Sequence, residues 1–137
     1  MSAAFCTEGN KCKTQSAKCK MRENILKDKS YEFALRIVKL YRHLTEDKRE
    51  FVLSKQVLRS GTSTGANIVE GNRAESKMDF VHKLAIAHKE SFETEYWISL
   101  LKDSEYITEK QAESVLADCQ ELQKLLTTSI KTAKNNQ

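Results

Sequence analysis

The 137-residue chain contains no proline and only four glycines. Proline fixes φ, lacks a backbone N–H and concentrates in turns and edge strands. Average proteins use about 5% proline and about 7% glycine. The scarcity of both residues argues against collagen-like, low-complexity and turn-rich β structures. It favours a few long helices joined by short loops, and the chain length suits one domain with one core.

Long apolar segments are also missing. No apolar run reaches the roughly 18 residues of a membrane-spanning helix, so we expect no membrane partner. No secretory leader pattern precedes the patterned sequence, which predicts a cytoplasmic protein whose cysteines are free thiols. The spacing of Cys6, Cys12 and Cys19 lacks the paired cysteines of a zinc site. The isolated Cys119 is predicted to be a small core residue.

Catalytic and cofactor-binding motifs are not evident. His82 and His88 lie six residues apart, so they cannot chelate a metal as an i, i+4 pair. The segment Ser60–Gly65 lacks the G-x4-G-K-[ST] frame of a phosphate-binding loop. Glu90 and Glu93 are better explained by ion pairs than by acid–base chemistry. We therefore expect no enzymatic activity, no cofactor, no metal and no small-molecule substrate.

Apolar residues at spacings of three and four predict four helices. They run from near Ser30 to about Leu44, from about Phe51 to Gly71–Asn72, from near Ser76 to about Ser104, and from Thr108 to near Lys134. Short loops make consecutive helices antiparallel. The predicted fold is all-α, an up-down-up-down four-helix bundle over residues 22–134. We expect residues 1–21 to form a disordered extension and residues 135–137 to form a frayed tail.

Local details sharpen this prediction. Ser30, Ser76 and Thr108 are candidate N-caps, and Thr108 with Gln111 fits a capping box. The buried stripe predicted for the third helix consists of Phe80, Val81, Leu84, Ala87, Ser91, Phe92, Ile98 and Leu101.

Two glycines, Gly61 and Gly65, interrupt the second helical pattern. Each costs about 1 kcal/mol relative to alanine, but the apolar register continues across both of them. We therefore predict one continuous helix in which they allow another backbone to approach closely.

The net charge of +4 is unevenly distributed along the sequence. Residues 1–20 and 22–73 are basic, 74–121 are acidic, and the remaining C-terminal residues are basic. Such blocks can pair between helices, pair between subunits, or present cations to phosphates. The candidate nucleic-acid face consists of Lys27, Lys29, Arg36, Lys39, Arg42, Lys48 and Arg49.

A set of polar residues follows the glycine stripe of the second helix at helical spacing. This polar ladder consists of Gln56, Arg59, Ser60, Ser63, Asn67 and Glu70. It can form a subunit seam or a hydrogen-bonded layer inside one bundle, and either arrangement can use Glu93 as a partner. Adjacent helical residues diverge by about 100°, so at least one of Tyr96 and Trp97 must leave the core stripe. An aromatic residue placed there is a typical interface anchor.

Two segments resemble a known family. Residues 53–70, LSKQVLRSGTSTGANIVE, and residues 79–97, DFVHKLAIAHKESFETEYW, are similar to its signatures. The ending of the last helix, residues 126–134, fits as well. The chain is identified as a member of the bacterial four-helix bundle proteins encoded in ribosomal RNA intervening sequences. The similarity covers about residues 22–134 and excludes residues 1–20.

This resemblance implies a four-helix bundle that assembles as a ring-like homopentamer. It also implies a relationship to the accessory protein of diversity-generating retroelements, which binds a reverse transcriptase and RNA through a strongly basic surface. The patterned domain of this chain is nearly neutral, and it carries Thr64 where the signature has isoleucine. Our leading hypothesis is thus a self-assembling, non-enzymatic scaffold or interaction module. The alternative is an accessory factor that binds structured RNA or a nucleic-acid enzyme.

Overall fold

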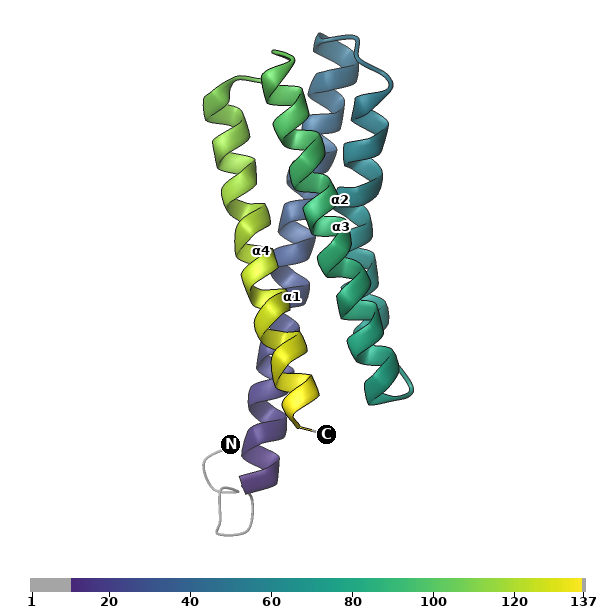
Figure 1. The fold of residues 1–137 in the computed structure, drawn as a ribbon, viewed down its shortest axis with the longest axis vertical. Helices are drawn as coiled ribbons and strands as arrows, with labels where there is room; N and C mark the ends of the chain where they lie inside the picture. Colours follow the sequence, from purple (N-terminus) through teal and green to yellow (C-terminus); the bar gives the residue numbers. More distant parts are fainter. Residues whose placement is uncertain (1–10, 137) are drawn as a thin grey trace.

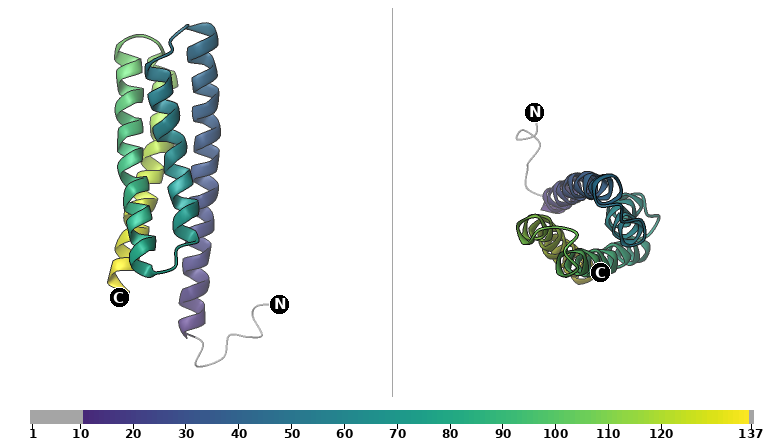
Figure 2. Two further views of the ribbon diagram at one scale, coloured as in Figure 1. Left: turned by 90° about the vertical axis from the view of Figure 1, so that its right-hand side faces the viewer. Right: turned by 90° about the horizontal axis from the view of Figure 1, so that it is seen from above.

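A computed structural model describes residues 11–136, apart from the side chains of residues 11–16 and Cys19. Its elements are α1 (Lys11–Arg42), the π-helical turn η2 (His43–Asp47), α2 (Leu53–Asn72), α3 (Lys77–Asp103) and α4 (Glu109–Asn135). The four long helices run alternately up and down, side by side (Figures 1 and 2). No strand occurs among the described residues. The predicted four-helix bundle is confirmed.

The start of the first helix was predicted wrongly. α1 begins at Lys11 rather than near Ser30, so residues 11–21 are helical and project past the end of α4 (Figure 1). Ser30 is not an N-cap: it is 1% exposed, and its hydroxyl donates to the carbonyl of Lys27 at 2.8 Å. Residues 11–21 contain neither glycine nor proline, so good local helix formers extend α1 beyond the core. Residues 1–10 lie outside the described part of the chain.

The core runs along the inner faces of all four helices. Its largest fully buried side chains are Phe33, Ile37, Leu44, Ile68, Leu84, Ile98, Leu101, Leu122 and Leu126. Cys119 belongs to this core as predicted, and its Sγ donates to the carbonyl of Ser91 at 3.2 Å. Burial raises the pKa of the Cys119 thiol to about 12. The thiol is therefore protonated at neutral pH, and its role is packing.

The inward stripe of α3 differs from the prediction at two positions. Phe92 is 49% exposed, whereas Thr94 is fully buried. Ser91 occupies the inward position instead of its larger neighbour, and adjacent residues of a helix point about 100° apart. Hydrophobicity alone therefore misplaced Phe92, which belongs to the surface.

Three predicted end signals of the later helices are confirmed. The hydroxyl of Ser76 accepts the backbone N–H of Asp79 at 3.0 Å. Thr108 and Gln111 form the reciprocal capping box at the start of α4. The second helix ends at Asn72, as its Gly-Asn stop signal indicated.

The second helix is continuous through both interior glycines. A Cβ atom on Gly61 would lie 2.8 Å from both Cγ atoms of Ile37 in α1. On Gly65 it would lie 3.4 Å from the Oγ of Ser30, an ordinary contact distance. Gly61 therefore leaves room for the Ile37 side chain, and Gly65 lies close to the α1 backbone at Ser30, so both glycines serve packing as predicted.

We expect Gly61→Ala to destabilise the bundle. Overpacking against β-branched Ile37 costs about 1–3 kcal/mol, and the better helix propensity of alanine returns only about 1 kcal/mol. The expected net loss is about 1 kcal/mol, measured by urea denaturation. Gly65→Ala is the matched control and should leave stability equal or slightly higher. A Gly61→Ala protein as stable as the wild type would contradict the proposed contact.

The connection from α1 to α2 is held by a buried carboxylate. Glu50 is 8% exposed and accepts the backbone N–H groups of Val52, Leu53 and Ser54 at 3.1, 3.0 and 2.7 Å. Burial acts to raise the pKa of Glu50, but these hydrogen bonds outweigh burial and lower it below its usual value. Glu50 thereby takes the place of a side-chain N-cap for α2, satisfying donors that a helix start leaves open.

The lowered pKa predicts a pH-dependent stability. Ionised Glu50 stabilises the fold above its unfolded-state pKa, and this contribution is lost as the pH falls through the lower folded-state pKa. Glu50→Gln should cost about 0.5–2 kcal/mol at pH 7. Because the amide does not titrate, the difference from wild type should shrink as the pH is lowered from about 6 to about 3. Urea denaturation across this range measures it, and a difference that does not change with pH would refute the role of the charge.

Candidate functional site

The polar ladder of α2 faces α3 of the same chain. Arg59 is ion-paired with Glu93 and lies 3.3 Å from the carboxylate of Glu90. In the last turn of α2, Glu70 forms an ion pair with Lys83 of α3 at 3.5 Å. The charged members of the ladder thus connect two neighbouring helices within one bundle.

The uncharged members of the ladder lie deeper. The hydroxyls of Ser60 and Thr94, both fully buried, are 2.9 Å apart. Asn67 donates to the carbonyl and the hydroxyl of Ser63 at 2.9 and 3.1 Å, and Gln56 is half-buried on the same helix. Of the two arrangements that the sequence left open, these contacts form a hydrogen-bonded layer within one chain, and the subunit seam stays a prediction.

Glu90 and Glu93 form an ion-pair cluster with Arg59. Burial raises the pKa of Glu90, the adjacent Glu93 raises it further, and Arg59 opposes both effects. The hydrogen bond with Glu93 in turn raises the pKa of Arg59. Both carboxylates therefore point toward the Arg59 guanidinium. This ion-pair cluster joins α3 to α2.

The two kinds of polar contact should differ in their contribution to stability. Arg59→Ala removes a half-exposed ion pair and should cost less than about 1 kcal/mol. Thr94→Val leaves the buried Ser60 hydroxyl without its partner and should cost about 1–3 kcal/mol. Urea denaturation measures both. We also expect Arg59→Ala to leave the oligomeric state unchanged, and a change would restore the seam interpretation.

Tyr96 and Trp97 point in different directions, as predicted. Tyr96 is 59% exposed, whereas Trp97 is half-buried and packs against the core. Their rings meet edge to face with centroids 5.1 Å apart. Phe92 lies one turn before Tyr96 and meets the ring of His88 in the same way at 5.0 Å. We call Phe92 and Tyr96 the α3 patch.

A second exposed apolar surface lies across α1 and α2. We call it the α1–α2 patch, and it consists of Tyr31, Leu35, Ala66 and Val69. An open groove of about 540 Å³ runs between the two helices here, and Tyr31, Ala66 and Val69 line it. Sequence reasoning missed this patch, although Leu35 and Val69 both lie outside the regular inward spacing of their helices.

The two patches lie on different sides of the bundle at similar levels. Gly61 of α2 contacts Ile37 of α1, and Ser60 of α2 forms a hydrogen bond with Thr94 of α3. These residues therefore lie at about the same height along the bundle axis. α1 packs mainly on α2 and α4 rather than on α3, which makes α1 and α3 diagonal neighbours (Figure 2). Phe92 borders α4, where it lines a shallow groove with Gln120 and Gln123. The molecule therefore exposes apolar side chains between α1 and α2 on one side and on α3 on another, where Phe92 lies beside polar residues of α4.

Two of the seven residues of the candidate nucleic-acid face form ion pairs within the chain. Lys29 pairs with Glu121 at 2.9 Å, and Arg36 pairs with Asp118 at 2.6 Å while also donating to Ser114. These contacts join α1 to α4. The remaining cations form no ion pair with any described residue, and all are exposed: Lys27, Lys39, Arg42, Lys48 and Arg49.

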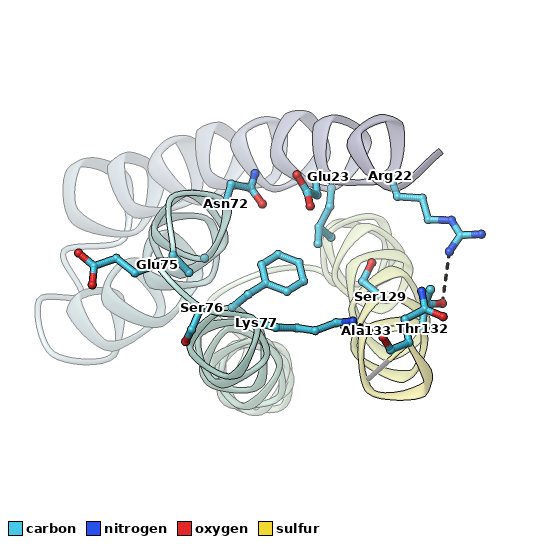
Figure 3. A pocket seen from close by; sticks show the side chains of 14 residues that line it. Arg22, Glu23, Asn72, Glu75, Ser76, Lys77, Ser129, Thr132 and Ala133 are labelled. Atoms are coloured by element: carbon cyan, nitrogen blue, oxygen red, sulfur yellow. Dashed lines mark hydrogen bonds between the residues drawn. The ribbon is translucent and has the colours of Figure 1, made fainter. Parts of the chain in front are cut away.

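The end of the bundle near the two termini holds a cavity of about 410 Å³ (Figure 3). Phe80 forms part of its wall, and Lys77 reaches across it to donate to the carbonyl of Asn136 at 2.6 Å. Arg22 closes another side by donating to Thr132 at 3.2 Å. Sequence reasoning missed this cavity because its walls come from distant segments and share no motif.

Metal-binding clusters and membrane-spanning helices are both absent from the described part of the chain. Among the side chains that the structure describes, no three histidine, cysteine or acidic groups lie close enough together to hold a metal ion. Over the same residues, no helix has the length and apolarity needed to cross a bilayer.

Comparison with known proteins identifies relatives but not an activity. The 23S rRNA-intervening sequence protein family matches residues 22–128. A crystal structure of a protein of unknown function from the S23 ribosomal protein family of Bacteroides thetaiotaomicron is 56% identical, with a TM-score of 0.80. The alignment covers 80% of this chain and 98% of that one. No match was found among curated proteins.

Proposed function

The chain belongs to the 23S rRNA-intervening sequence protein family, and from this premise we propose that it is a non-enzymatic interaction module that assembles with further copies of itself. The assembly is a closed ring, and the resemblance of its signatures to the family sets the expected size at five copies. The ring joins the α1–α2 patch of each copy to the α3 patch of the next.

The exposure of the two apolar patches carries this proposal. Tyr31 is 66% exposed, Leu35 47%, Phe92 49% and Tyr96 59%. Aromatic residues that anchor protein interfaces combine a large apolar area with a polar tip. Because the patches differ in composition and lie on different sides, one copy can bind two neighbours. Head-to-tail contacts of this kind generate rings when the rotation closes.

The ion pairs of the bundle support a scaffold role. Glu90 and Glu93, predicted from the sequence to form ion pairs, are both held by Arg59. Lys29 and Arg36, part of the candidate nucleic-acid face, are held by acidic residues of α4. These charged side chains therefore contribute to contacts between helices of one chain.

Complementation of two defective variants tests the head-to-tail arrangement. Tyr31→Glu with Leu35→Glu removes one patch, and Phe92→Glu with Tyr96→Glu removes the other. Each double variant alone should be a monomer by native mass spectrometry. Mixed together, they should form a one-to-one heterodimer, because each supplies the intact patch that the other lacks. The wild type should form a ring.

Met78→Glu is the control, since Met78 is 78% exposed and lies outside both patches; it should leave the ring intact. Circular dichroism checks that each variant is folded. A wild type that is monomeric at micromolar concentration would overturn the proposal. Homodimers of either double variant would instead show that a patch pairs with its own copy.

The exposed cations of α1 and its following loop support a second candidate, an accessory factor for structured RNA or a nucleic-acid enzyme. Lys39, Arg42, Lys48 and Arg49 are exposed without an ion pair among the described residues. Retention of structured RNA by such a surface would weaken steeply as salt increases. Absence of salt-dependent retention at low ionic strength would eliminate this candidate.

A further inference from the structure

Charged residues gather at two corners of the bundle end opposite the chain termini. The basic corner surrounds the α1–α2 connection and contains Arg42, Lys48, Arg49 and Lys55, which outnumber the exposed carboxylates of Glu46 and Asp47. The acidic corner surrounds the α3–α4 connection and contains Asp103, Glu105, Glu109 and Glu113, which outnumber the neighbouring Lys102 and Lys110. We propose that the basic corner of one copy docks on the acidic corner of the next copy. This inference rests on the proposed ring and adds an electrostatic contact to its apolar one.

The basic corner is exposed and held in a fixed shape. Phe51 is 50% exposed and Val52 70% exposed, and the guanidinium of Arg49 lies over the Phe51 ring, 5.8 Å from its centroid. The three backbone hydrogen bonds accepted by buried Glu50 fix the loop on α2. A preorganised loop loses little conformational entropy when it binds. Its composition, apolar side chains beside cations, fits a partner surface that carries carboxylates.

The acidic corner provides such a surface. All four of its carboxylate residues are exposed, and only Asp103 has an ion contact among the described residues, a loose one of 3.8 Å to Lys102. Lys48 lines the same open polar hollow as Glu105 and Glu109 of its own chain, yet it forms no ion pair with either. The charges of both corners therefore remain available for a second molecule.

The symmetry of a ring brings the two corners together. All copies in a cyclic ring point the same way along the axis, and the two apolar patches lie at similar levels of the bundle. Contact between patches of adjacent copies therefore aligns their equivalent ends. Both corners lie at the same end, on the α1–α2 side and the α3–α4 side respectively (Figure 1). The basic loop of one copy then faces the acidic loop of its neighbour.

Charge reversal with rescue tests this contact in the full-length protein. Arg49→Glu with Lys55→Glu reverses the basic corner, and Asp103→Lys with Glu105→Lys reverses the acidic corner. Either pair alone places like charges at every junction and should raise the dissociation constant of the ring roughly tenfold or more. The quadruple variant restores opposite charges at each junction and should recover assembly. Analytical ultracentrifugation measures all of them.

Lys131→Glu with Lys134→Glu is the matched control, because both lysines are exposed on α4 near the other end of the bundle. It should assemble as the wild type does. The wild-type ring should also dissociate more readily as sodium chloride rises from about 50 to about 500 mM, since exposed charge pairs are screened. This salt dependence needs no substitution and so keeps the test independent of variant folding.

The outcomes separate the two proposals. A wild type that forms rings, with charge-reversed variants that assemble equally well, would overturn the corner contact and leave the ring standing. A monomeric wild type would overturn both. If reversal of the basic corner leaves assembly unchanged but abolishes RNA retention, the corner binds nucleic acid, and the proposed contact is wrong.

Discussion

The close approach of α1 and α2 at Gly61 is the contact on which the arrangement of the other helices depends. Ile37 occupies the space that a side chain on Gly61 would need, so α2 can bind α1 through one face only. With that face covered, the polar ladder is directed toward α3. Ala66 and Val69 stay on the outside beside Tyr31. A single steric contact thus determines which residues of α2 are structural and which are available to partners.

Several charged side chains of this bundle pair with a neighbouring helix, so their charge is less available for binding other molecules. Arg59 joins α2 to α3, whereas Lys29 and Arg36 join α1 to α4. The excess positive charge in the first half of the sequence and the excess negative charge in the second half are partly consumed by these pairs. Some of the charges left over lie at the loop end of the bundle, and others, such as Lys27, Lys124 and Lys131, are spread along the helices. The charges at the loop end suit contacts between copies that share one orientation.

The exposed apolar residues complete this description. A monomeric helical bundle normally places large apolar side chains inward, and scattered exceptions need no explanation. Here Tyr31, Leu35 and Val69 lie on one side of the bundle and Phe92 and Tyr96 on another, while Phe51 and Val52 lie at the basic corner and Met21, Ile25 and Met78 lie toward the other end. Packing and charge therefore support the proposed ring, in which each bundle would contribute its exposed surface to the assembly.

Sequence patterns alone predict the number and direction of the helices, the caps at Ser76 and Thr108, the continuity of α2 and the burial of Cys119. These features depend on local spacing and on intrinsic backbone preference. The exposure of Phe92, the burial of Thr94 and the contacts that Arg59, Ser60 and Glu70 make with α3 required the tertiary structure. Each of these depends on which face a neighbouring helix covers, and a helix presents the same periodic pattern whatever packs against it.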